Sequence, residues 1–213
     1  MHSPPTWMNS VPHMPAGPSG PTWLVTPGTA YARFDSAMDS GAEVVLLDLE
    51  DSVPAESKVE ARMAVLAFAR ARASMSRGPL LGVRINSVAG ADGQREDLAA
   101  MREMSTWPDL IVVPKAESRC DIDTVARTVR EAHAATRVWA LIESPQGIVD
   151  LPGIVHTPGL SGVLFGASDY AAAAGCRRTS RAMWYPRSQL VTAAAVADLP
   201  AVDSPYFAQA VLS

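Results

Sequence analysis

The stretch Val44-Val-Leu-Leu-Asp-Leu-Glu-Asp-Ser-Val-Pro54 decides how the rest of the chain is interpreted. An unbroken run of Val and Leu is typical of a strand that is buried on both faces, as in a parallel sheet. The run ends in three carboxylates, Asp48, Glu50 and Asp51. Like charges at such close spacing repel one another, so their clustering suggests a site that handles a cation or a proton.

The same pattern of an apolar run followed by polar residues recurs along the chain. Six further strands are predicted, at 22–26, 80–85, 110–113, 137–142, 162–165 and 199–202. Helices are predicted at about 29–40, 57–76, 93–105, 121–135 and 188–197, with a last helical segment after 202. Strands that alternate with helices predict a parallel sheet, either a (β/α)8 barrel or an open doubly wound sheet.

The barrel is the favoured α/β architecture, because no Gly-rich phosphate loop follows the first strand. A complete barrel has eight strands, whereas seven are predicted here. We therefore expect a TIM-barrel type of fold that is truncated after the seventh strand or completed by a partner. Residues 22–213 are expected to form this domain, and the proline-rich residues 1–21 a disordered extension without signal-peptide features.

Composition narrows the class of protein. The chain has 213 residues, a net charge of −4, 48% hydrophobic residues and 19% charged residues, which is typical of one globular domain. No apolar run approaches the roughly 18 residues of a membrane span, and no basic patch predicts nucleic-acid binding. Cys120 and Cys176 lack metal-type spacing, which favours a reducing, cytoplasmic location over a disulfide scaffold.

Charged residues at the predicted strand ends are the candidates for chemistry. Glu143 and Asp169 follow adjacent strands and together suit Mg²⁺, which takes one or two protein carboxylates and completes its shell with water and substrate oxygens. Asp169 has a simpler alternative role as the N-cap of a helix over 171–174. Arg84 either clamps a substrate carboxylate or forms a salt bridge to the Asp48 cluster, and both alternatives stay open.

Two other kinds of chemistry are less favoured. Lys115 is a conceivable Schiff-base lysine, but neighbouring carboxylates are expected to hold its amine protonated. A zinc site or a Ser-His-Asp triad is not expected, because none of the four histidines follows a predicted strand. These histidines are His2, His13, His133 and His156.

Taken in order, the strand-end motifs resemble those of the citrate lyase β-subunit-like family, within the 2-oxo-acid aldolase and citrate lyase superfamily. The resemblance covers about residues 22–208. The matching pieces are Pro27-Gly28, Leu47-Asp-Leu-Glu-Asp-Ser-Val53, Val83-Arg-Ile-Asn86, Val113-Pro-Lys-Ala-Glu-Ser118, Trp139-Ala-Leu-Ile-Glu143, Phe165-Gly-Ala-Ser-Asp169, and Pro186-Arg-Ser-Gln-Leu190 through Val202-Asp203.

The resemblance implies a magnesium-dependent carbon–carbon lyase that acts on a citryl, malyl or citramalyl thioester of coenzyme A or a carrier protein. It implies that Glu143 and Asp169 bind Mg²⁺, with Glu143 also at the substrate. Arg84 is implied to bind the substrate carboxylate and to act in catalysis. It also implies an oligomer, a trimer in several relatives.

For the acidic motif, the resemblance implies catalytic roles for Glu50 and Asp51. Asp48 and Lys115 are implied to contact the residues around the metal and not the metal itself. Asp51 stands where the pyruvate-aldolase branch of the superfamily carries a histidine base, so the citrate-lyase-like branch is favoured.

Three departures from the family pattern define the alternatives. Ala32 and Ser36 stand where relatives carry an Arg and a Lys for coenzyme A phosphates, and Ser168 stands where they carry a Glu. The eighth strand and the segment after it are missing from the predicted pattern. One alternative is a free 2-oxo-acid aldolase that needs no coenzyme A. The other is a shortened, non-catalytic binding or assembly subunit.

Overall fold

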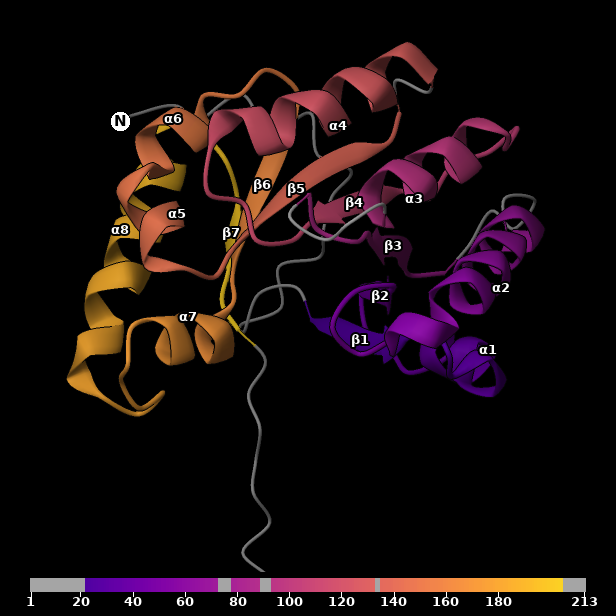
Figure 1. Ribbon diagram of the computed structural model, residues 1–213, viewed down its shortest axis with the longest axis horizontal. Helices are drawn as coiled ribbons and strands as arrows, with labels where there is room; N and C mark the ends of the chain where they lie inside the picture. The colour runs from indigo at the N-terminus through magenta and orange to yellow at the C-terminus, as the bar shows by residue number, and fades with distance from the viewer. Residues whose placement is uncertain (1–21, 73–77, 89–92, 133–134, 205–213) are drawn as a thin grey trace, which may run out of the picture.

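Seven parallel strands form one curled sheet in which every strand lies beside its neighbours in chain order (Figure 1). The structure is a computed structural model that describes residues 22–72, 78–88, 93–132 and 135–204. The strands are β1 (Trp23–Pro27), β2 (Val44–Asp48), β3 (Leu80–Arg84), β4 (Leu110–Val113), β5 (Arg137–Ile142), β6 (Leu160–Phe165) and β7 (Ala201–Val202). Within these described ranges β1 and β7 pair on one side only, so the sheet is an open part of a barrel, as predicted.

Helices cover the outer side of the curled sheet (Figure 1). They are α1 (Phe34–Met38), α2 (Lys58–Arg72), α3 (Gly93–Arg102), α4 (Arg119–Ala132), α5 (Pro145–Val149), α6 (Leu151–Val155), α7 (Ala167–Ala173) and α8 (Trp184–Val196). Three 3₁₀ turns, η2 (Tyr31–Arg33), η3 (Ala55–Ser57) and η4 (Arg181–Met183), lead into α1, α2 and α8. The predicted extension at 1–21 and the last helical segment after 204 lie outside the described residues.

One predicted helix is wrong in extent, and two short helices were not predicted. The helix predicted over 29–40 is a 3₁₀ turn followed by the five-residue α1. The short helices α5 and α6 were not predicted, and each has a proline within its first two residues. Proline suits the first turn of a helix but breaks a longer one, so this segment forms two separate turns.

The unbroken apolar run of β2 is explained by burial on both faces of the sheet. Val45 and Leu47 pack on the outer side, against residues of the covering helices. Val44 and Leu46 pack on the inner side, in a second cluster with inward-facing residues of β4 and β5. The inner cluster is Val44, Leu46, Leu110, Val112, Trp139 and Leu141. A Cβ added at Gly82 would lie 2.6 Å from Leu110 Cδ1, so this position of β3 has no room for a side chain.

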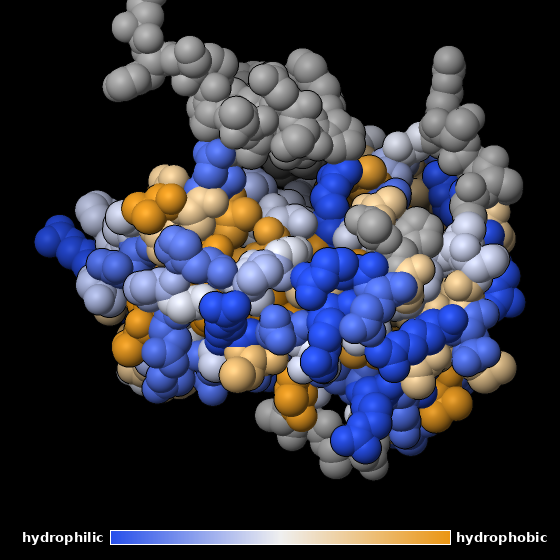
Figure 2. Space-filling view, turned by 90° about the horizontal axis from the view of Figure 1, so that it is seen from above, coloured by the Kyte–Doolittle hydropathy of each residue, from blue (hydrophilic) through white to orange (hydrophobic). Residues whose placement is uncertain are grey.

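The surface of the molecule is mostly hydrophilic where Figure 2 shows it. Hydrophobic side chains occur there in small, separate patches, which is ordinary for a folded domain. In the part of the chain that the structure describes, no helix is both long and apolar enough to cross a membrane.

Candidate active site

The candidate site lies at the carboxyl ends of the strands, on the inner face of the sheet. Because side chains alternate along a strand, Asp48 follows Val44 and Leu46 on the inner face at the carboxyl end of β2. Arg84 ends β3, and the register of the two strands pairs it directly with Asp48. By the same alternation Glu143 follows Trp139 and Leu141 of β5. The carboxyl ends of parallel strands share one edge, so these groups gather on one rim.

Arg84 is bound to Asp48 through two parallel hydrogen bonds. Its Nε donates to Asp48 Oδ1 at 2.6 Å and its Nη2 donates to Asp48 Oδ2 at 2.7 Å. Burial alone would raise the pKa of Asp48, but the Arg84 guanidinium outweighs it and holds that pKa below its usual value. The salt bridge predicted as one alternative is therefore present. Arg84 Nη1 takes no part in this pair with Asp48 and lies 3.1 Å from Glu50 Oε2 instead.

A second cation, Lys115, contacts the acidic motif through its side chain and Glu143 through its backbone N–H. Lys115 Nζ lies 2.6 Å from Glu50 Oε1 and 2.9 Å from Asp51 Oδ1. Arg84 Nη1 lies 3.1 Å from Glu50 Oε2 and 3.9 Å from Asp51 Oδ2. Burial would lower the pKa of Lys115, but its bonds to Glu50 and Asp51 raise that pKa instead. A protonated ammonium does not form a Schiff base, so Lys115 serves here as a cation.

The pKa values of Glu50 and Asp51 are shifted in opposite directions. Burial raises the pKa of Glu50, even though Lys115 and Arg84 lie beside it. Burial also acts on Asp51, but its hydrogen bonds with Lys115 and Glu50 and the charges of Lys115 and Arg84 together outweigh burial and lower the pKa of this half-exposed carboxyl. Glu50 is thus the group in the motif that is better suited to carry a proton. Asp51 is better suited to remain ionised.

Glu143 is a buried carboxyl in surroundings that disfavour its charge. Its residue is only 4% exposed, and its Oε1 accepts a hydrogen bond of 2.9 Å from the backbone N–H of Lys115. Burial raises the pKa of Glu143 to about 8, and the charges of Asp169 and Glu50 add to this rise. Lys115 adopts a left-handed backbone conformation with φ of 51°, which is uncommon for a residue other than glycine. Such strain is frequent at functional sites.

Asp169 lies in the first turn of α7, and it does not cap that helix. The N-cap position is Gly166, and the backbone N–H of Ala167 donates instead to Ser204 Oγ at 2.7 Å. The capping role considered for Asp169 is therefore wrong, because α7 begins four residues earlier than the 171–174 helix on which that role depended. Asp169 is half-buried, and its charge acts on Glu143 across the rim.

Sequence patterns did not reveal two supporting residues. Lys58 Nζ donates to the backbone oxygens of Leu49 and Glu50 at 2.7 and 2.6 Å, which fixes the loop that carries the acidic motif. A Cβ at Gly166 would lie 2.6 Å from Glu143 Oε2, so this glycine makes room for the carboxylate. The sequence carries no signal for either residue, because both contacts depend on how the folded segments pack together.

The donor set of the rim fits a hard divalent cation. Within the described ranges no three His, Cys, Asp or Glu side chains are grouped so as to enclose a metal by themselves. A pair of carboxylates is nevertheless the usual protein contribution to Mg²⁺, which keeps waters and substrate oxygens in its other positions. Burial is the main cause of the raised pKa of Glu143, and the charges of Asp169 and Glu50 add to it, so a bound cation would favour the ionised carboxylate. Glu143 and Asp169 are the residues that would hold the ion.

Comparison with known proteins agrees with this class of fold. The family model described as HpcH/HpaI aldolase/citrate lyase matches residues 22–212. A citrate lyase subunit beta-like protein of Deinococcus radiodurans is 28% identical over 95% of this chain and 67% of its own length. A (3S)-malyl-CoA thioesterase of Cereibacter sphaeroides is 30% identical over 72% of this chain. The chain spans 51% of that thioesterase, about half of its length.

A solved structure gives the same fold with ligands bound. It is the citrate lyase beta subunit of M. tuberculosis complexed with oxaloacetate and magnesium, with a TM-score of 0.71 and 28% identity. The match covers 89% of this chain and 80% of that one. The chain belongs to the HpcH/HpaI aldolase/citrate lyase family, which confirms the resemblance inferred from its strand-end motifs.

Proposed function

We propose that this chain is a magnesium-dependent carbon–carbon lyase that acts on a hydroxy-acid thioester of the citryl, malyl or citramalyl type. The observation that carries the proposal is the meeting of Arg84 and the buried Glu143 on one rim, joined through Lys115. The named relatives support the substrate class, since one is a malyl-CoA thioesterase and one binds oxaloacetate and magnesium.

In this proposal, Glu143 and Asp169 hold the Mg²⁺ ion, and Glu143 also borders the substrate. When bound, the ion would stabilise the negative charge that develops on a substrate oxygen as the carbon–carbon bond breaks. Asp48 fixes the Arg84 guanidinium through Nε and Nη2, and Nη1, which lies beside Glu50, is the nitrogen that we assign to the substrate carboxylate. Lys115 orients the acidic motif and, through its backbone N–H, one oxygen of Glu143.

The departing thioester fragment must receive a proton on its α-carbon. Glu50 is the acid that we assign to this step, because burial raises its pKa and favours the protonated carboxyl. Asp51 is assigned to accept a proton from the substrate hydroxyl, because Lys115 keeps it ionised. The pair thus divides acid and base roles by environment.

A second candidate function is aldol cleavage of a free 2-oxo acid. It is favoured by the exposed surface of η2 and α1, where Ala32 and Ser36 provide no cation for coenzyme A phosphates. Arg33 is the exposed cation beside them. The same rim residues would serve either substrate. The two functions therefore differ in whether the surface outside the rim binds coenzyme A.

The substrate class is tested by offering magnesium with a malyl or citramalyl thioester, and separately with a free 4-hydroxy-2-oxo acid. Cleavage of the thioester, abolished in Glu143→Ala, is the expected result. Cleavage of the free acid alone would select the second candidate. Turnover of neither, with no stabilisation by magnesium, would instead support a non-catalytic binding or assembly subunit.

The proposal includes a cytoplasmic, homo-oligomeric enzyme, and a trimer is the state implied by the family resemblance. Cys120 and Cys176 are both free thiols, which is consistent with a reducing compartment. Among the described residues, the outer strands β1 and β7 each have an unpaired edge, which a neighbouring subunit could cover. Light scattering on the purified protein would give the oligomeric state.

A further inference from the structure

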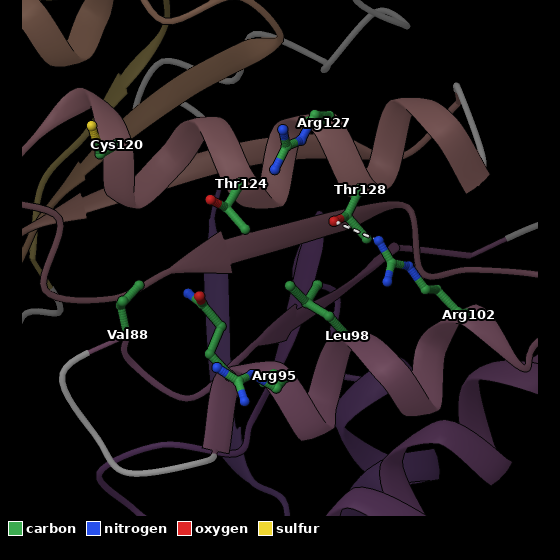
Figure 3. A pocket seen from close by; sticks show the side chains of 9 residues that line it. Val88, Arg95, Leu98, Arg102, Cys120, Thr124, Arg127 and Thr128 are labelled. Atoms are coloured by element: carbon green, nitrogen blue, oxygen red, sulfur yellow. Dashed lines mark hydrogen bonds between the residues drawn. The ribbon is translucent and has the colours of Figure 1, made fainter.

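A cavity of about 350 Å³ lies between α3 and α4, in the helical layer outside the sheet (Figure 3). None of the residues that line it belongs to the rim that contains Arg84 and Glu143. Its volume is within the range of small-molecule sites, which is roughly 300–1,000 Å³. The lining groups that matter here are Gln94, Arg95, Arg102, Thr124, Arg127 and Thr128.

Three arginine residues from two helices line this cavity. Arg95 and Arg102 come from α3, and Arg127 comes from α4, as Figure 3 shows. Among the described residues, no carboxylate oxygen lies within 4.0 Å of any of the three. The acidic side chains of α3, Glu96 and Asp97, are instead paired with Arg62 at 3.0 and 2.6 Å. Within the described ranges, positive charge therefore collects here without a carboxylate in direct contact.

Hydroxyl groups of α4 face the same space. Thr124 points into the gap between the two helices in Figure 3. Arg102 Nη2 donates to Thr128 Oγ1 at 3.1 Å, which links the two helices and directs this guanidinium toward the cavity (Figure 3). A guanidinium that is positioned in this way offers its remaining N–H groups to an oxygen-rich ligand.

Gln94 provides an independent sign of a ligand. It is only 7% exposed, it lines the cavity, and among the described residues its Nε2 has no hydrogen-bond partner. Buried polar groups in folded proteins are nearly always paired, so this amide donor indicates an acceptor that the described residues do not supply. Gln94 is also the second residue of the ten-residue helix α3, whose N-terminus favours negative charge. Exposed arginines alone are ordinary on a solvated protein surface. A buried amide donor without a partner is unusual, and it therefore indicates a ligand.

We propose that the cavity between α3 and α4 binds a small polyanion through Arg95, Arg102 and Arg127, with Gln94 donating to one of its oxygens. The ligand carries at least two negative charges on phosphate or carboxylate groups, the anions that guanidinium groups bind in pairs of hydrogen bonds. Its oxygens also accept from the Thr124 hydroxyl. This site is separate from the rim and does not depend on the proposed lyase activity.

The test is calorimetric titration of the full chain with two probes, pyrophosphate and propane-1,2,3-tricarboxylate, in magnesium-free buffer at constant ionic strength. The double variant Arg95→Gln/Arg127→Gln removes two lining cations. The control Arg70→Gln/Arg130→Gln removes two exposed arginines of α2 and α4 that do not line the cavity, so both variants change net charge equally.

At least one probe is expected to bind the unmodified protein, and the lining double variant to weaken that binding about tenfold or more. The control should stay within about threefold of the unmodified protein, since screened surface charges contribute little. Binding of pyrophosphate alone would assign a phosphate ligand, and binding of the tricarboxylate alone a carboxylate ligand. No binding of either probe, or equal weakening in both double variants, would overturn the proposal.

Gln94→Leu tests the buried donor separately from the charges. It replaces the amide by an apolar side chain of similar size, so the fold should persist and thermal unfolding will verify this. Affinity for the bound probe is expected to fall, because one oxygen loses its donor. Unchanged affinity would contradict the role of Gln94.

Discussion

Arg84 forms the salt bridge that was one of its two predicted roles, and the other role, a clamp for a substrate carboxylate, is part of our proposal. Its position after a buried strand predicted an anion beside it, because an unpaired buried guanidinium is costly. Which anion it meets depends on the register of β2 and β3, and that register places Asp48 directly opposite. The salt bridge uses Nε and Nη2, so the clamp for a substrate must use the other N–H groups. The sequence predicted that charged residues lie at the ends of strands. It did not predict which of these residues pair with one another across neighbouring strands.

Replacement of Arg84 by lysine tests this division. A lysine keeps the positive charge but cannot hold Asp48 with two parallel hydrogen bonds and also bind a substrate carboxylate. We expect kcat/KM for the thioester to fall about a hundredfold, the range for loss of a positioned donor. Steady-state kinetics would measure it, with thermal unfolding as the check on folding. A variant as active as the unmodified protein would contradict the clamp.

Glu143 leads to a pH dependence of magnesium binding. Its pKa of about 8 means that a proton occupies the metal-free carboxyl at neutral pH, and the ion must displace that proton. Apparent magnesium affinity should therefore rise about tenfold for each pH unit between about 6 and 7.5, and level off above 8. Titration calorimetry at several pH values would measure this. A flat profile would contradict the raised pKa.

The stability of the metal-free protein should change in the opposite direction. A carboxyl whose pKa is higher in the folded state than in the unfolded state binds more protons when folded. Its stabilising effect is complete below the ordinary pKa of Glu and is lost as the pH rises through about 8. Glu143→Gln imitates the protonated form, so its loss of stability between about pH 6 and 9 should be smaller than that of the unmodified protein. Urea unfolding across this range compares the two proteins, and equal pH dependence would argue against a buried, protonated Glu143.

At the scale of elements, the strands were predictable and the connections between β5 and β6 were not. Strands β2 and β4 are continuous apolar runs, so hydrophobicity alone locates them. Helices α5 and α6 contain five residues each, too few for a helical period to be recognised. The turn from β6 into α7 places Gly166 against Glu143, and this close approach depends on the packing of two neighbouring strand ends.

A pair of glycine substitutions tests that turn. Gly166→Ala would place a Cβ 2.5 Å from Glu143 Cβ and 2.6 Å from its Oε2, so the carboxylate must move. We expect magnesium affinity to fall about tenfold or more, since a metal ligand is displaced. Gly153→Ala is the control, because an added Cβ there meets nothing within 4 Å inside α6. Equal magnesium affinity in the two variants would contradict the argument.

At the scale of the whole molecule, the inner cluster holds the curled sheet together. Trp139 of β5 stacks edge-on against Trp23 of β1, with ring centroids 5.0 Å apart. These strands lie four positions apart in the sheet order, so the contact fixes its curvature. The number of strands and their parallel order followed from the sequence. The barrel type of curvature was predicted too, but the Trp23–Trp139 contact that fixes it was not, because it depends on which inward side chains meet across the sheet.

Trp139→Ala should destabilise the fold as a whole. Trp139 is buried among the inner cluster, and truncation of a large buried aromatic costs about 3–5 kcal/mol. Trp184→Ala is the control, because Trp184 is 72% exposed and its truncation should change stability by less than about 0.5 kcal/mol. Urea unfolding of both variants would measure the difference. Similar stabilities would mean that the inner cluster does not support the sheet.

The central claim is that Glu143 and Asp169 hold a magnesium ion on which cleavage of a hydroxy-acid thioester depends. The most direct measurement is the single-turnover rate of malyl-thioester cleavage across magnesium concentrations, for the unmodified protein and for Asp169→Asn. We predict a rate that saturates with magnesium in the unmodified protein and falls at least about a hundredfold in the variant. Cleavage without magnesium, or an equal rate in Asp169→Asn, would contradict the claim.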